Sequence, residues 1–374
     1  MQKIGKWIKS EMVMCVSLVL ALGSMLVVRP DRAYADYIDF RTLGILLSLM
    51  LVVAGLRGLG VFAAIGRWLI AKTNTAKGLA LVFVCLNFFL SMVITNDVAL
   101  LTFVPFAIEV LVMAQLEKYM IRLVVLETIA ANLGSMLTPL GNPQNLFLYA
   151  GNHMSLGAFV KIMLPYSMAA FVLLVITTCL CIGKDTAKSD CTTSTVPKNP
   201  KWVLQLLGYL LLFVVCMLTV LRILPFYITL AIVIAGVLLL DWRNLTKADY
   251  GLLFTFVFLF VFVGNLGRIP AISSCLASLT TGNEVSVAVL TSQVISNVPA
   301  TILLAGFTDN TCDLIIGVNI GGLGTLIASM ASLISFKCYC RQDHAKAGKY
   351  LGIFTLFNVL YLLALLGLYY VLSK

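Results

Sequence analysis

Two short polar tracts interrupt long apolar stretches, and their side chains are of the kinds that bind small ions. One tract is Thr95-Asn96-Asp97 and the other is Ser296-Asn297. An asparagine offers an amide carbonyl to a cation and an NH2 group to an anion. A helix that begins at such a tract also directs free N–H groups and a partial positive charge to the same place. We therefore predict substrate binding by Thr95, Asn96, Ser296 and Asn297, with both asparagines also available to an ion.

A third polar tract, at 138–145, contains two prolines four residues apart among Gly, Asn and Gln. An unbroken helix cannot continue through it. The backbone carbonyls freed by such a break are ligands for sodium in unwound transporter helices. A glycine-rich tract at 319–325 has a similar composition, although small residues there would equally suit close helix packing. We assign Thr138 and Thr325 to the substrate, and the predicted ion ligands are Asn132, Gly141, Asn142, Asn145 and Asn319.

The composition places these tracts in a membrane protein. Hydrophobic residues make up 61% of the chain and charged residues 11%, with a mean hydropathy of +1.03. An ordinary soluble domain has about a quarter charged residues. The apolar runs have the length of roughly 20 residues that a helix needs to cross a bilayer. This composition excludes a soluble enzyme and predicts an all-α, multi-pass protein of the cytoplasmic membrane, in contact with lipid.

Asp97 is the most informative charged residue in an apolar run. A carboxylate at the middle of a bilayer costs about 3 kcal/mol on insertion scales, so it is expected to face protein or water and to have a cation or proton as its partner. We therefore predict that Asp97 binds the coupling ion. The alternative is that the residue lies closer to water and caps the helix that follows it.

The polar tracts predict two re-entrant hairpins and two broken transmembrane helices. The stretch 78–114 is too long for one span and carries its polar tract near the middle. It predicts a re-entrant helical hairpin, and 282–308 predicts a second one. Broken transmembrane helices are predicted over 127–149 and 313–337.

These segments divide the chain into four parts. We expect an N-terminal span and loop over 1–41, a first repeat over 42–182, a cytoplasmic linker over 183–201 and a second repeat over 202–374. Within the first part, the run Met12–Val28 is favoured as a retained span over a cleaved signal peptide.

Surface helices are expected at three places outside the spans. These are 57–70, 115–126 and 268–282, each of which carries charges beside apolar residues. By the same reasoning we expect Glu127 to lie near a membrane interface.

The polar features recur in the same order in both halves. Positions 132, 138 and 145 correspond to 319, 325 and 332, and the separation is the same for all three pairs. We call this common separation the repeat spacing, and such regular recurrence indicates an internal repeat. With the N-terminus and Lys188 inside, and Asp39, Gly282 and Lys374 outside, 19 of the 26 Lys and Arg residues are cytoplasmic. The two hairpins then enter from opposite faces, which predicts inverted-topology repeats with substrate and ion sites at their interface.

At these residues the chain resembles the ion transporter superfamily, which contains divalent anion/sodium symporters, citrate-type permeases, and arsenite and sodium/proton antiporters. The tracts at 95–97 and 296–298 resemble its paired Ser-Asn-Thr signatures, and 138–145 is similar to its Thr-Pro-x-Gly-Asn-Pro-x-Asn break. The resemblance runs from about Thr42 to the C-terminus. It implies a sodium or proton site in each half, one shared substrate site, an elevator-like motion and a homodimer.

The chain departs from this pattern at three places, and its Asn-Asp tip is closer to the arsenite and sodium/proton members and to anion permeases of the group than to the dicarboxylate symporters. Asp97 and Val298 replace the signature threonines, and 328–332 lacks the prolines of the first break. The predicted function is secondary transport of a small carboxylate or inorganic oxyanion, coupled to sodium or protons. Sodium/proton antiport and arsenite efflux are the alternatives.

Other functional classes lack support in the sequence. The net charge of +10 arises from short loops between spans and does not indicate nucleic acid binding. No Walker A sequence and no Ser/His, paired-Asp or His/Glu constellation indicates an enzyme, intramembrane or otherwise. His153 and His344 stand alone, so no metal is expected beyond a sodium ion and no cofactor is predicted. The ten cysteines include no CxxC pair, and we expect them to pack as small apolar side chains.

Overall fold

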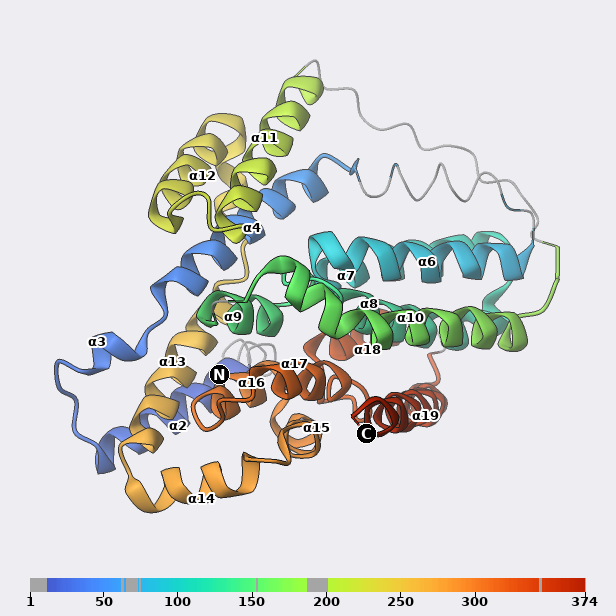
Figure 1. Cartoon of the computed structure of the whole chain (residues 1–374). Coiled ribbons are helices and arrows are strands. Elements are labelled where there is room, and N and C mark those ends of the chain that lie inside the picture. Colours follow the sequence, from blue (N-terminus) through green and yellow to red (C-terminus); the bar gives the residue numbers. More distant parts are fainter. Residues whose placement is uncertain are drawn as a thin grey trace, which may run out of the picture.

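The computed structural model describes residues 12–61, 64, 73, 75–152, 154–186, 201–342 and 345–373. Regular structure in these residues is helical, apart from an isolated β-bridge between Thr75 and Thr186 (Figure 1). Eight of the described helices are long and apolar enough to cross a membrane. The prediction of an all-α, multi-pass membrane protein is therefore confirmed.

The helices before the linker include one long antiparallel pair and one interrupted helix. They are α2 (Met12–Val27), α3 (Tyr34–Tyr37), α4 (Phe40–Gly58), α6 (Ala76–Ile94), α7 (Asn96–Met113), the 3-10 helix η1 (Glu117–Tyr119), α8 (Met120–Ser135), α9 (Pro143–Gly151) and α10 (Leu156–Cys181).

The helices after the linker begin with three of the candidate spans. They are α11 (Trp202–Val220), α12 (Phe226–Asp241), the 3-10 helix η2 (Trp242–Lys247), α13 (Tyr250–Gly267), α14 (Pro270–Thr280), α15 (Glu284–Ile295), α16 (Asn297–Ala305), α17 (Thr311–Ile320), α18 (Met330–Cys340) and α19 (Ala347–Leu372).

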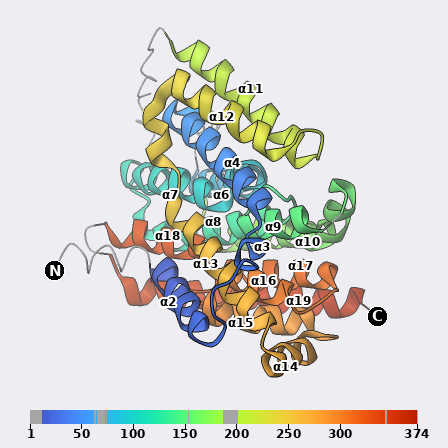
Figure 2. The same ribbon diagram turned by 90° about the vertical axis from the view of Figure 1, so that its left-hand side faces the viewer.

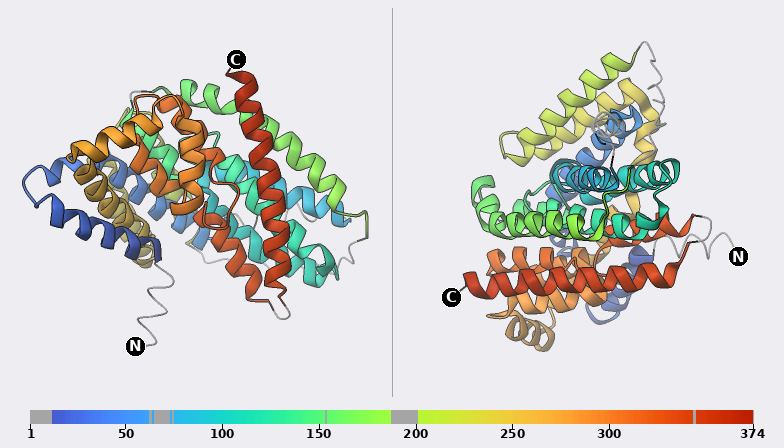
Figure 3. Two further views of the ribbon diagram at one scale, coloured as in Figure 1. Left: turned by 90° about the horizontal axis from the view of Figure 1, so that it is seen from below. Right: turned by 90° about the vertical axis from the view of Figure 1, so that its right-hand side faces the viewer.

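The helices form layers. Figure 2 shows α6–α10 as one layer lying against a second layer formed by α15–α19, and the right-hand view of Figure 3 shows the same two layers from the opposite side. Helices α4, α11 and α12 pack together beside the first layer, and α2 packs along α13. The two layers meet where α18 packs against α7 and α8, α19 against α8 and α10, and α9 against α16 and α17, and the halves of the chain also meet where α4 packs against α11 and α12.

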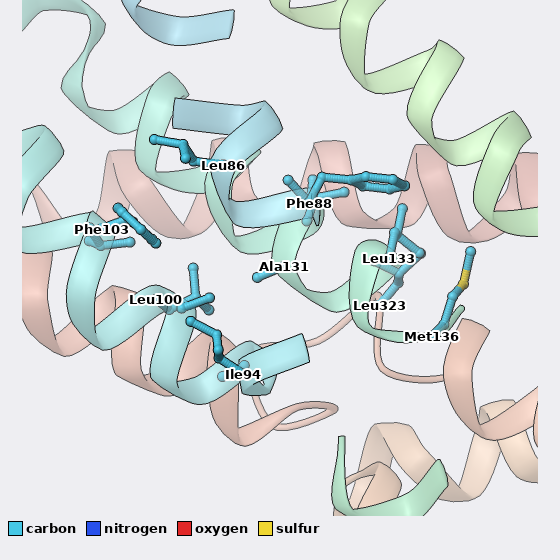
Figure 4. Close-up of a cluster of buried hydrophobic side chains, with 14 of the residues drawn as sticks. Leu86, Phe88, Ile94, Leu100, Phe103, Ala131, Leu133, Met136 and Leu323 are labelled. Atoms are coloured by element: carbon cyan, nitrogen blue, oxygen red, sulfur yellow. The ribbon is translucent and has the colours of Figure 1, made fainter. Parts of the chain in front are cut away.

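A shared apolar core surrounds the point where the two layers meet. Its side chains come from α6, α7 and α8 and from the segment that follows α17 (Figure 4). The labelled members are Leu86, Phe88, Ile94, Leu100, Phe103, Ala131, Leu133, Met136 and Leu323, each at most 5% exposed. Since burial of apolar surface is worth roughly 25 cal/mol per Å2, this packing fixes the breaks of both halves against each other.

Glycines allow each hairpin to approach its broken helix closely. A Cβ atom added at Gly134 of α8 would lie 2.0 Å from the carbonyl oxygen of Phe88 on α6. At the corresponding position in the second half, Gly321 would place a Cβ 2.8 Å from the Ser292 hydroxyl on α15. Equivalent contacts therefore recur in the two halves.

One expected surface segment lies in the interior. The residues 115–126 were expected to follow the membrane surface, but α8 begins at Met120 and residues 123–126 are at most 1% exposed. Glu127, expected near an interface, is fully buried. The charges at 117, 118 and 122 belong to η1 and the first turn of α8, so they mark a helix start and not a surface helix. Most of the expected surface helix 57–70 lies outside the described residues.

Candidate substrate and ion site

A single residue joins the two helices at each hairpin tip. Thr95 links α6 to α7 with φ 75° and ψ 148°, and Ser296 links α15 to α16 with φ 74° and ψ 155°. Residues other than glycine rarely adopt this backbone conformation, which costs about 1–3 kcal/mol and occurs mainly at functional sites. The two tips therefore share one strained geometry.

Each tip is bonded to the break in its own half. The backbone N–H of Asn96 donates to the Gly141 carbonyl at 3.0 Å, and the N–H of Asn297 donates to the Ala328 carbonyl at 2.9 Å. Gly141 and Ala328 are also separated by the repeat spacing. The contact that holds the first tip against its break thus recurs at the second.

The predicted threonines fasten the breaks to the hairpins. The Thr138 hydroxyl donates to the Met92 carbonyl on α6, and the Thr325 hydroxyl donates to the Gln293 carbonyl on α15 at 3.2 Å. Thr325 is exposed, and its backbone N–H donates to the Gln293 side chain at 2.8 Å. Both hydroxyls are therefore used within the protein.

The first break is shaped by two of the predicted asparagines. Asn142 caps α9, because its Oδ1 accepts the backbone N–H of Asn145 at 2.9 Å. The Asn145 amide donates at 3.2–3.4 Å to three carbonyls of the break, those of Ser135, Met136 and Thr138. Of these, only Thr138 belongs to the predicted break at 138–145, and its carbonyl also accepts the backbone N–H of Gly141 at 3.3 Å.

The two broken helices meet through reciprocal amide contacts. On one side, the Asn319 Nδ2 of α17 donates to Asn145 Oδ1 at 2.6 Å, and the Asn319 Oδ1 accepts from Asn142 Nδ2 at 3.1 Å. An asparagine can donate and accept at the same time, which lets one residue satisfy both partners.

The other side repeats this pattern with serines. Asn132 Oδ1 of α8 accepts from the Ser329 hydroxyl at 3.1 Å, and its Nδ2 donates to the Ser332 hydroxyl at 3.5 Å. By the repeat spacing, Ser329 and Ser332 correspond to Asn142 and Asn145. Asn132 Oδ1 also accepts from the Asn96 amide at 3.0 Å.

We call these residues of the contact region the crossing cluster. They come from both halves and are at most 5% exposed: Asn96, Asn132, Asn142, Asn145, Asn319, Ser329 and Ser332. Helices α7, α9, α16 and α18 begin beside it, and α6, α8, α15 and α17 end beside it. Helix N-termini stabilise anions and C-termini stabilise cations, so the arrangement can hold one of each.

A cavity adjoins the first tip. Its polar lining is Thr95 and Asn142, and the remaining wall is apolar, with Leu46, Leu49 and Val53 from α4 among its members. Small-molecule sites combine apolar walls with a few placed polar groups in this way. At about 30 Å³ the cavity has room for a water molecule or a bare ion beside the crossing cluster, and not for a carboxylate.

Asp97 occupies the first turn of α7, next to the crossing cluster. It is half-buried, its N–H donates to Asn96 Oδ1 at 2.9 Å, and its carboxylate accepts no hydrogen bond from the described part of the chain. The charged group that acts on it electrostatically is another carboxylate, Asp249, at the start of α13. The second half has Val298 at the equivalent position.

The structure brings most of the predicted residues together. The first tip is bonded to Gly141 of the first break, and the second tip is bonded to the second break. The Asn297 side chain lies against Gly322.

The sequence did not predict two residues of this region. Ser329 donates to Asn132, and the Gln293 side-chain amide donates to two carbonyls of the second break. The repeat spacing, counted from Asn142, would have located Ser329. Gln293 has no counterpart with a similar side chain, because Met92 stands at its equivalent position.

Comparison with known proteins identifies the family. The sequence model of the citrate transporter family matches residues 2–322. The inner membrane protein YbiR of Escherichia coli is 34% identical over 310 residues, which are 82% of each chain.

Two further relatives are named as transporters. An uncharacterized transporter of Methanocaldococcus jannaschii is 31% identical over 357 residues, or 95% of this chain and 96% of the relative. The silicon efflux transporter LSI3 of Oryza sativa is 32% identical over 143 residues, or 38% of this chain and 29% of the relative. Together with the helices that can cross a membrane, the family match shows a multi-pass transporter of the cytoplasmic membrane and not an enzyme. The chain belongs to the citrate transporter family.

Proposed function

We propose that the protein is a secondary active transporter that moves a small anion, a carboxylate or an inorganic oxyanion, by alternating access. Substrate and coupling ion bind at the crossing cluster and the two hairpin tips. The observation that carries this proposal is the reciprocal contact of Asn132 and Asn319 with the opposite break. When the two halves move against each other, contacts between them break and form again, so a site built from both halves changes with the motion that alternating access requires.

The proposal includes two inverted-topology repeats, over 42–182 and 202–374, with re-entrant hairpins and a cytoplasmic linker between the repeats. Three observations support it: the constant repeat spacing, the matching tip geometry of Thr95 and Ser296, and the excess of Lys and Arg on one side. The two tips then approach the middle of the membrane from opposite faces.

An anion suits the electrostatics of the site. The crossing cluster contains no charged side chain, so the positive potential for an anion would come from the four helix N-termini, with the four C-termini beside it left to favour the coupling cation. The description of the family names citrate, and the name of the partial rice relative names silicon. A carboxylate is the first candidate and an inorganic oxyanion is the second.

Coupling to sodium or to protons completes the proposal. A sodium ion would be held by the Asn142 amide oxygen and the Gly141 carbonyl, each of which accepts one hydrogen bond and keeps a second lone pair. The Asn132 amide oxygen would join them when one of its two donors, Asn96 or Ser329, moves away.

Asp97 would bind a proton or a sodium ion, because no described basic group neutralises it. Its carboxylate is also the observation that favours sodium/proton antiport as the alternative. The homodimer implied by the family resemblance remains part of this proposal.

Uptake into proteoliposomes tests the proposed function. Purified protein is assayed with radiolabelled citrate, other carboxylates, phosphate, arsenite and silicic acid, with sodium and pH gradients imposed separately. We expect accumulation of an anion that depends on one of the gradients. Cation exchange without any anion uptake would identify an antiporter instead.

A further inference from the structure

A second buried carboxyl group lies in the first half, outside the crossing cluster. Glu127 stands in the middle of α8 and is fully buried. Its Oε1 accepts a hydrogen bond from the Nδ2 of Asn87 on α6 at 2.9 Å, and Asn87 is also fully buried. Glu127 precedes Asn132 on the same helix, where each residue advances the helix axis by about 1.5 Å. The carboxyl group is therefore less than three helical turns from the crossing cluster.

The hydrogen bonding around this pair is incomplete. Among the described residues no group donates to Glu127 Oε2 or to Asn87 Oδ1. A buried acceptor without a donor costs about 1–3 kcal/mol, and an ionised buried carboxylate costs far more. A neutral carboxylic acid removes the charge and gains an O–H donor. Protonation therefore accounts for the pair better than ionisation does.

The described surroundings of Glu127 supply no cation to balance a carboxylate. The described titratable side chains on which Glu127 acts electrostatically are the Tyr350 hydroxyl of α19 and the Cys338 thiol of α18. Neither carries a positive charge at neutral pH. The Arg57 guanidinium of α4 acts on Cys338 and donates to the Leu101 carbonyl at 3.2 Å.

The second half shows that the fold does not need this polar pair. By the repeat spacing, the position equivalent to Glu127 is Leu314 in α17. Asn87 precedes the tip residue Thr95 by as many residues as Ala288 of α15 precedes Ser296, so these two positions are equivalent. Leu314 is 1% exposed and Ala288 is not exposed. At the same place in the same packing arrangement, two apolar residues suffice.

We propose that Glu127 is a proton-binding site of the transport cycle. It carries a proton in the conformation described here and releases it as H+, leaving a carboxylate, when movement of α8 opens the site to water. The coupling role rests on the proposed transport function, whereas the bound proton does not. Because Asn132 lies on the same helix, the motion that remakes the crossing cluster also moves Glu127.

Infrared spectroscopy tests the bound proton without any substrate. The purified protein is titrated from acid to alkaline pH, and the carboxylic acid C=O stretching band is followed in the wild type and in Glu127→Gln. We expect a band component that persists at neutral pH in the wild type and is lost in Glu127→Gln, whereas any component from Asp97 is common to both proteins. Glu109→Gln, which removes an exposed carboxyl group from α7, should keep that band. A wild-type protein without the band at neutral pH would overturn the proposal.

Transport tests the coupling. Citrate uptake into proteoliposomes is measured with and without an inward proton gradient for the wild type, Glu127→Gln and the double variant Asn87→Ala/Glu127→Leu, which copies the second half. We expect both variants to lose at least nine-tenths of the gradient stimulation while keeping citrate exchange at equal pH. Gradient stimulation equal to that of the wild type in either variant would overturn the coupling role. If the wild type does not move citrate, the same comparison is made with the anion that it does move, and absence of transport of every anion would count against the proposed function, with the infrared result unaffected.

Discussion

Asparagine side chains carry the contacts between the two halves, because a primary amide donates and accepts at once. Asn319 uses both functions to bind the opposite break, and Asn132 does the same with two serines. Charged side chains at these positions would need desolvation and a counterion. An uncharged cluster can close around an anion or a cation without leaving a buried charge behind when it is empty.

Asp97 supplies the charge that the cluster lacks, and its removal is expected to change coupling. Asp97→Asn keeps the shape of the side chain but removes the charge that repels an incoming anion. We expect the stimulation of uptake by the coupling gradient to fall at least fivefold, with the apparent affinity for the anion changed less than twofold. Proteoliposome uptake at several imposed gradients measures both quantities. An unchanged gradient dependence would show that the coupling ion is held elsewhere, with the break at 138–145 as the first candidate.

The sequence was sufficient to find the asparagines of the site, because Asn, Gly and Pro inside apolar runs are conspicuous there. It was not sufficient to give their partners. Ser329 looks like any small residue in a membrane helix, and Glu127 follows closely on charged residues that suggested a surface. Burial of Glu127 depends on packing of α8 against α6, α18 and α19, which no local pattern encodes.

At the scale of helices, each hairpin and its broken helix form one packed unit. The close approach at Gly134 leaves no room for a methyl group, because its Cβ would lie 2.0 Å from a backbone oxygen. We expect Gly134→Ala to destabilise the protein by about 1–3 kcal/mol, the usual cost of overpacking. Thermal unfolding in detergent measures the change. Gly157→Ala is the matched control, since its Cβ meets nothing within 4 Å, and equal stability of the two variants would refute the packing argument.

A partly exposed acidic residue, Asp185, ties the segment after α10 to the start of α6. Asp185 accepts from Tyr119 at 2.6 Å and pairs with Lys118 at 2.6 Å, and its carbonyl accepts the N–H of Ala76 at 2.8 Å. The hydrogen bonds from Lys118 and then from Tyr119 lower the pKa of the Asp185 carboxyl.

A lowered carboxyl pKa stabilises the folded state above the unfolded pKa of about 4, and this contribution is lost as pH falls through the lowered value. The thermal midpoint of the wild type should therefore decline more steeply with acidification than that of Asp185→Asn. The difference should be small because the pair is exposed. Parallel declines of the two midpoints would contradict a stabilising role for this ion pair.

For the whole molecule, hydropathy was sufficient to predict an all-helical membrane protein, since long apolar runs have few other folds available. The start of the first broken helix was placed at 127, whereas α8 begins at Met120, because charges at 117, 118 and 122 resemble a surface helix. The layered arrangement of the halves depends on contacts between residues far apart in the sequence, such as Asn132 with Ser329, which single-sequence patterns do not define.

Two native cysteines test the proposed orientation. Cys312 lies at the start of α17 and Cys340 at the end of α18, both exposed, so they mark the two ends of the second broken helix. In single-cysteine variants, an impermeant maleimide added to intact cells should label Cys312 at least tenfold faster than Cys340. Permeabilised cells provide the control for reactivity. Equal labelling in intact cells would contradict inverted repeats with a cytoplasmic Cys340.

The central claim is that both halves build one transport site at the crossing cluster. Gradient-driven anion uptake by Asn96→Ala, Asn132→Ala, Asn297→Ala and Asn319→Ala tests it, with Asn358→Ala as the control. Asn358 is equally buried but donates to a carbonyl of its own helix, α19, away from the cluster. We expect each of the four variants to fold and insert but to lose at least nine-tenths of uptake, and the control to keep more than half. Wild-type uptake in variants of either half would contradict a site shared by both.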